Sequence, residues 1–232
     1  IVSLRAAITR IGLTDTVNTV SLHFFQKLLP RFPDVQGFSY RDFWTHSWAC
    51  AAASRRLGHP GLEMDVIPGE LYMAGMLQGM GKLLLAIHYP KDFKACVKRA
   101  IQFNQPLDMI QKDVFGTSDS LIASKVLTSW ELPGNICQAV AHCRNPELAD
   151  PEHRIIAAMT QYGYSIVEQS GVGSSGDPIK LAPEETFIGS RSKLKINQPA
   201  VREPLLKEIN QLITSRAGEM ADSSTKTPKK KP

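Results

Sequence analysis

The fold of this chain is decided by the segment Ala74-Gly75-Met76-Leu77-Gln78-Gly79-Met80-Gly81-Lys82-Leu83-Leu84-Leu85. Pro68 and the apolar residues that follow it predict a helix over residues 68–78. This helix is apolar on nearly every side, which is typical of a helix buried at the centre of a bundle. A turn containing Gly79, Gly81 and Lys82 then leads into a second predicted helix.

Helical periodicity continues along most of the chain, and strand patterns are scarce. Ser39 stands three residues before Asp42, as in a capping box, and opens a helix that Gly58 ends. We therefore predict an all-α fold, a bundle of about ten helices. The predicted helices cover residues 2–11, 15–29, 40–57, 68–78, 82–88, 91–103, 107–114, 118–130, 134–143 and 152–168.

The pattern predicts one helical domain over residues 1–170. A loop that is flexible by composition follows over residues 171–186, then a C-terminal helical appendage over 187–221, whose last helix Asn197 caps. Residues 222–232 are predicted to be a disordered basic tail. The loop contains a GxGxxG match, but it follows a helix rather than a strand, which disfavours a phosphate-binding function.

Composition excludes several classes of protein. Four lysines lie in the last seven residues, and without them the net charge of +5 falls to +1. A nearly neutral body disfavours specific nucleic-acid binding. No apolar run reaches the roughly 18 residues of a membrane span. The four cysteines form no CxxC pair, which predicts reduced thiols and a cytoplasmic location.

His46 is the first candidate for chemistry. It shares a helical stripe with Phe43, Cys50, Ala53 and Leu57, so its side chain is predicted to face the core. A lone buried histidine is usually satisfied by a hydrogen bond to a neighbouring backbone or hydroxyl group. The alternative is that His46 is the first ligand of a metal site.

A metal site at His46 needs further donors, and the sequence supplies few. Gln78 offers one neutral oxygen and Gly79 offers no side chain. Thr160 lies on an apolar stripe and is predicted to bond within its own helix. His142 is a second candidate for the same cavity, but two histidines without an acid form a poor catalytic site. We therefore expect no metal and no cofactor.

Five segments, in order over residues 4–167, resemble the HDOD domain, the HD-related output domain of bacterial signalling proteins. The resemblance implies an all-helical fold and a regulatory role, since many members lack a complete HD ligand set and are thought to act without catalysis. The chain departs from the family pattern: Gln78 and Gly79 stand where HD proteins have His and Asp, and Asp119 stands where a His is common. The matching segments are Trp44-Thr45-His46-Ser47, Ala74–Leu85, Trp130-Glu131-Leu132-Pro133, His142 and Arg154–Thr160.

The favoured prediction is a non-catalytic module of signal transduction that contacts protein partners of a bacterial pathway, with a homodimer as one arrangement. One alternative is a divergent phosphohydrolase of nucleotides or cyclic dinucleotides, with His46 and His142 as metal ligands and Lys82 for phosphate. Another is a small-ligand sensor that holds an organic molecule between His46, Gln78 and His142. The residues of this vestigial pocket are His46, Gln78, Gly79, Lys82, Asp119, His142 and Thr160.

Overall fold

A computed structural model describes residues 3–225, and the chain divides after Arg31 into two compact units. The first unit consists of α1 (Leu4–Ile11) and α2 (Leu13–Leu28). Ser3 caps α1 by accepting a hydrogen bond from the backbone N–H of Ala6. Gly12, with a φ of +90°, separates the two helices. The structural division at Arg31 therefore falls inside the segment that the sequence predicts to be one domain.

The second unit, from Phe32 onward, is all helical apart from its loops and one isolated bridge between Val35 and Phe38. Every predicted helix is present, with its ends within about two residues of the predicted ones. The prediction of an all-α bundle is thus confirmed. The helices are α3 (Tyr40–Leu57), α4 (Pro68–Leu77), α5 (Met80–His88), α6 (Pro90–Phe103), α7 (Leu107–Phe115), α8 (Asp119–Ser129), α9 (Gly134–His142), α10 (Arg154–Ser170) and α11 (Pro199–Thr225), with short 3₁₀ turns at Pro60–Leu62, Pro146–Leu148, Pro183–Glu185 and Lys195–Asn197.

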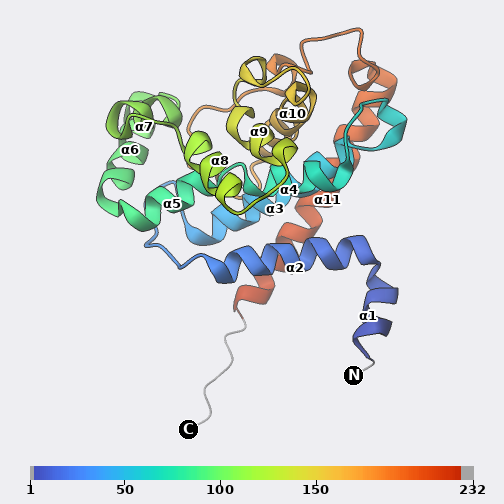
Figure 1. Cartoon of the computed structure of the whole chain (residues 1–232), viewed down its shortest axis with the longest axis horizontal. Helices are drawn as coiled ribbons and strands as arrows, with labels where there is room; N and C mark the ends of the chain where they lie inside the picture. Colours follow the sequence, from blue (N-terminus) through green and yellow to red (C-terminus); the bar gives the residue numbers. More distant parts are fainter. Residues whose placement is uncertain (1–2, 226–232) are drawn as a thin grey trace. The chain divides into compact units, whose positions relative to one another are not determined.

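The centre of this unit is the packing of α3, α4 and α10 against one another (Figure 1). Small residues allow these helices to approach closely. A Cβ on Gly75 of α4 would lie 2.6 Å from the carbonyl oxygen of Cys50 on α3. Gly163 of α10 likewise meets Ser54 of α3. The close approach brings His46, Gln78 and the end of α10 into one buried region.

The outer helices complete the bundle. α8 packs on α5 and α9, while α6 and α7 lie side by side (Figure 1). Gly116, with a φ of +69°, ends α7, and the side chain of Ser118 then caps α8. No helix within residues 3–225 is both long and apolar enough to cross a membrane.

The C-terminal segment departs from the sequence prediction in three ways. α11 packs on α3 and α10 rather than forming an appendage, and the Arg56–Glu208 ion pair joins it to α3 at 2.6 Å. Asn197 does not cap α11, because its amide donates to the carbonyls of Ile188 and Arg191 in the preceding turn. The helix also continues to Thr225, through part of the predicted tail. Residues 226–232 lie outside the described part.

Gly81 tests how closely α5 approaches α8. A Cβ at this position would overlap the backbone carbonyl of Asp119, so Gly81→Ala should destabilise the protein by about 3 kcal/mol. Gly69→Ala is the matched control, because nothing lies within 4 Å of its added methyl group. It should leave stability unchanged or raise it by up to about 1 kcal/mol. Urea unfolding measures both, and equal effects of the two substitutions would contradict the packing.

Candidate functional site

His46 and Gln78 meet at the thiol of Cys50. The two ring nitrogens of His46 lie 3.6 Å and 3.8 Å from Cys50 Sγ, and Gln78 Nε2 donates to the same sulfur at 3.9 Å. Burial raises the pKa of the Cys50 thiol well above its usual range, and the charge of Glu168 adds to the effect. Burial therefore favours the protonated thiol over the thiolate.

The main partner of His46 is Glu168, near the end of α10. Nε2 of His46 lies 2.8 Å from Oε1 of Glu168, and each side chain is less than 5% exposed. Burial by itself raises the pKa of Glu168, but the hydrogen bond and charge of His46, together with Ser175 and Lys82, outweigh it and lower that pKa to about 2. The prediction that His46 faces the core is thus confirmed, but its neighbours are a carboxylate and a thiol rather than the predicted backbone or hydroxyl group.

Lys82 is buried deeply, with only 1% of its surface exposed. Its ammonium donates a hydrogen bond of 2.8 Å to the backbone carbonyl of Ser175. Burial and the nearby charge of Arg144 lower the pKa of Lys82, while the carboxylates of Asp119, Asp177 and Glu168 oppose this shift. A buried ammonium of this kind needs carboxylates around it. Lys82 is thus engaged inside the protein, although the phosphohydrolase alternative requires it for phosphate.

Arg144, just after α9, is the second cation of this cluster. Its Nη1 lies 3.3 Å from Asp177 Oδ2, and its Nη2 lies 3.9 Å from Asp119 Oδ2. The guanidinium also lies over the ring of Tyr164, 5.5 Å from its centroid. Burial opposes the charge of Arg144, but Tyr164, Asp119 and Asp177 outweigh it and raise its pKa. Asp119, a predicted site residue, is fully buried and faces this cation.

The segment predicted to be a flexible loop passes directly over these groups. We call residues 171–181 the strap. Ser174 donates two hydrogen bonds to the region from Gly37 to Asp42: its backbone N–H donates to the carbonyl of Asp42, and its hydroxyl donates to the carbonyl of Gly37. Tyr164 donates to the hydroxyl of Ser175, next to the Lys82 contact. The strap lacks helix and strand, but it is held by specific contacts along its length.

The glycines of the GxGxxG match serve this packing. Gly173 has a φ of +68°, and a Cβ there would lie 2.5 Å from the carbonyl oxygen of Asp42 and from the backbone N–H nitrogen of His46. Gly176 has a φ of +77° and meets the ring of Phe38. These positions need glycine for close approach to the protein itself, which agrees with rejecting a phosphate-binding function.

The remaining predicted site residues have structural contacts. Thr160 donates from its hydroxyl to the carbonyl of Ile156 at 2.8 Å, as the sequence predicts. Gly79 precedes α5 and lies against the ring of Phe43. His142 ends α9, is half-buried, and does not line the cavity described next.

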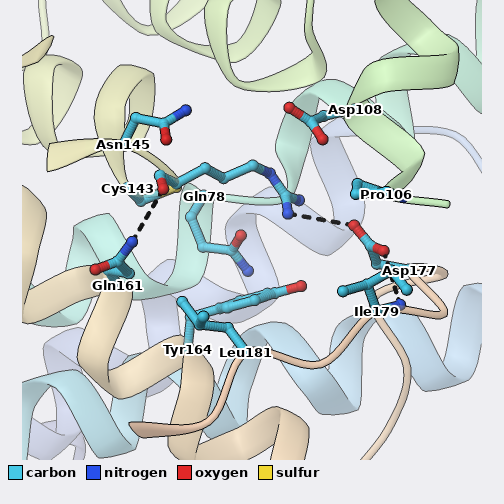
Figure 2. Close-up of a pocket in the computed structure, with 11 residues that line it drawn as sticks. Gln78, Pro106, Asp108, Cys143, Asn145, Gln161, Tyr164, Asp177, Ile179 and Leu181 are labelled. Atoms are coloured by element: carbon cyan, nitrogen blue, oxygen red, sulfur yellow. Dashed lines mark hydrogen bonds and ion pairs between the residues drawn. The ribbon is translucent and has the colours of Figure 1, made fainter. Parts of the chain in front are cut away.

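A cavity of about 220 Å³ lies beside the charged cluster (Figure 2). Of the predicted site residues only Gln78 lines it. The other walls come from the start of α7, the turn after α9, α10 and the strap. The lining residues are Gln78, Pro106, Asp108, Cys143, Arg144, Asn145, Gln161, Tyr164, Asp177, Ile179 and Leu181.

The side chains around His46 do not fit the divalent metal ion that the resemblance to HD proteins implies. Around His46 the nearest donors are one carboxylate, a protonated thiol and a neutral amide, while Thr160 bonds its own helix. Hard divalent cations require several oxygen ligands, and His46 already pairs with Glu168. Within residues 3–225 no three His, Cys, Asp or Glu side chains are grouped to hold a metal.

Sequence reasoning missed Glu168, Arg144, Asp177 and Tyr164. One signal was available: Tyr164 and Glu168 follow Thr160 at intervals of four, so all three share one face of α10. An acid that continues a buried stripe needs a cation or a donor opposite it. Asp177 had no such signal, because it lies in a loop of small residues that only the tertiary structure places against Arg144.

The His46–Glu168 pair predicts a pH dependence of stability. The folded pKa of Glu168, about 2, lies below its ordinary value, so the contribution is fully present above about pH 4.5 and is lost as the pH falls toward 2. Glu168→Gln should cost about 3 kcal/mol at pH 7, and the difference from wild type should shrink over that range.

The pair formed by exposed Glu152 and partly buried His153, at 3.6 Å, provides the control. Glu152→Gln should change stability by less than about 0.5 kcal/mol at any pH. Chemical denaturation between pH 2 and pH 7 measures both variants. A constant difference between Glu168→Gln and wild type across this range would show that the pair is not the source of the effect.

The strap contacts predict a contrast between two glycines that both have positive φ. Gly173→Ala should release the strap, because its methyl group collides with α3, and should increase protease cleavage and hydrogen exchange within residues 171–181. Gly171→Ala, with a φ of +70° and no atom within 4 Å, introduces the same backbone strain without the collision. If both variants are cleaved equally fast, steric contact with α3 does not hold the strap.

The fold of this chain is similar to those of several known proteins. No curated protein matches the chain. It is similar in structure to an HDOD domain protein of unknown function from Geobacter sulfurreducens, with a TM-score of 0.73 and 17% identity over 94% of this chain and 74% of the other. A candidate signal transduction protein from Marinobacter aquaeolei matches with a TM-score of 0.69 and 22% identity over 91% of this chain and 46% of that one.

A candidate phosphohydrolase from Shewanella amazonensis is also similar, with a TM-score of 0.59 and 18% identity over 96% of this chain and 73% of that one. At these identities the likeness shows a shared fold. The sequence itself matches the HDOD domain over residues 1–146. The chain therefore belongs to the HDOD domain family.

Proposed function

We propose that this chain is a non-catalytic module of signal transduction that acts through contacts with other proteins. One observation carries the proposal: the positions that would form an HD metal site have been given structural roles. His46 pairs with Glu168, Gln78 contacts Cys50, Gly79 packs on Phe43, and Thr160 bonds its own helix. A site rebuilt in this way retains the scaffold and loses the hydrolytic chemistry.

The family and the fold support a regulatory role. The matching Marinobacter protein is described as a candidate signal transduction protein, and this chain spans 46% of its length. Its partners would be proteins of a bacterial signalling pathway, and a second copy of the chain is one such partner. A cytoplasmic location fits the four cysteines, which are all buried and without disulfide bonds.

The structural similarity to the Shewanella protein supports the phosphohydrolase alternative only in that the two proteins share a fold. It requires His46, His142 and Lys82 to act together. Lys82 is buried and donates to the strap, and His142 lies outside the cavity. The geometry thus favours the non-catalytic module.

Metal content and turnover test the proposal together. After incubation with manganese, iron or magnesium and desalting, the purified chain should retain well under one metal ion per molecule. Hydrolysis of bis(p-nitrophenyl) phosphate and of cyclic dinucleotides should not exceed that of His46→Ala. The reason is that His46 has one carboxylate beside it rather than a ligand set.

An active HD phosphohydrolase serves as the positive control of the assay. One metal ion per chain that is lost in His46→Ala, with a rate that falls in the same variant, would overturn the proposal. The predicted protein contacts are tested by cross-linking in cells, followed by binding measurements with the purified partner. Turnover without any such partner would also contradict a module that acts by contact.

A further inference from the structure

The cavity beside the charged cluster carries an inference that goes beyond the proposed function. It is lined by five separate parts of the chain, is partly open to solvent and holds about 220 Å³. Liquid water occupies about 30 Å³ per molecule, so the volume corresponds to roughly seven waters, or to an organic molecule of one ring. Tyr164, Ile179 and Leu181 give the cavity apolar walls.

Gln78 presents to this cavity an amide that has a single long contact with the protein. The residue is 2% exposed, and Nε2 has only the contact of 3.9 Å to the weak acceptor Cys50 Sγ. Its side-chain oxygen has no hydrogen bond with the described residues, and it is open to the cavity rather than sealed in the core. Figure 2 shows the Gln78 side chain among the residues that line the cavity. A buried amide in this state favours a ligand that pairs with it.

The charges around the cavity disfavour an ionic ligand. Arg144 is already neutralised by Asp177 at 3.3 Å and Asp119 at 3.9 Å. Asp108 at the rim pairs with Lys112 at 3.2 Å. An added anion would lie close to the carboxylates of Asp119 and Asp177, and an added cation would lie close to Arg144 and Lys112. An uncharged ligand meets neither repulsion.

We propose that the cavity binds a compact, uncharged, planar molecule in which an N–H donor stands beside a carbonyl acceptor, as in a cyclic amide or ureide. Such a group pairs with the Gln78 amide through two hydrogen bonds, its N–H donating to Oε1 and its carbonyl accepting from Nε2. The pairing works for either orientation of the amide, so it does not depend on which atom is oxygen. The ring of the ligand lies against the apolar walls.

The strap forms one wall through Asp177, Ile179 and Leu181, so a bound ligand contacts both the strap and the core helices. The ligand position differs from that of the sensor alternative in the sequence analysis. It shares Gln78 with that alternative but involves neither His46 nor His142.

Calorimetry and ligand-observed NMR on the full chain test the proposal, with uracil and hydantoin as probes. Both should bind saturably. 1,3-Dimethyluracil, which lacks the N–H donors, should bind at least about tenfold more weakly than uracil. Gln78→Leu should weaken uracil binding by at least about tenfold, while Gln211→Leu, an exposed position on α11, should leave it unchanged.

Leu181→Trp keeps the test valid if Gln78→Leu fails to fold, because it fills the cavity from the strap and should abolish binding. Absence of saturable binding by both probes would overturn the proposal. So would equal binding of 1,3-dimethyluracil, retained binding in Leu181→Trp, or tighter binding of acetate or methylammonium. Ligand binding is measured on the isolated chain. If the probes fail to bind, the proposed protein contacts are unaffected, and if no protein partner is found, the proposed ligand site is unaffected.

Discussion

The burial of Lys82 is the constraint on which the rest of the second unit depends. An ammonium with 1% of its surface exposed cannot remain charged without acceptors around it. The strap brings the Ser175 carbonyl to its Nζ, and three carboxylates surround it from α8, α10 and the strap. The path of the chain after α10 therefore follows from the need to satisfy one cation, which explains why a loop of small residues is held in place.

The other buried charges near Lys82 also require partners, and they fall into two groups. His46 and Glu168 form a pair at one end, and Arg144 with Asp119 and Asp177 forms a group at the other. Buried charge pairs of this kind add less net stability than their number suggests, because each ion has been removed from water. Their main effect is on specificity: removing one member leaves another buried and unpaired. The residues around His46 thus form a set of internal contacts between α3, α10 and the strap.

Much of the fold was predictable because it is local. The apolar periodicity of α4, the Ser39 cap of α3 and the glycines that end α3, α7 and α10 are properties of short segments. The resemblance to HDOD domains likewise depended on short motifs in order, and the family match over residues 1–146 confirmed it. The departures at Gln78 and Gly79 were visible in the sequence, as was the bonding of Thr160 within its helix.

The partners of the site residues were not predictable in the same way. Glu168 could be placed on the face of Thr160, but its pairing with His46 depends on how α10 crosses α3. Asp177 and Ser175 lie in a segment without periodicity, and only the folded chain brings them to Arg144 and Lys82. The cavity depends on side chains from five parts of the chain, so its volume is set by how these parts pack together. The sequence by itself determined the helices and showed the departures from the HD pattern at Gln78 and Gly79, because both are local, whereas the tertiary structure decided the charge pairing and the cavity, because both join residues that are distant in the sequence.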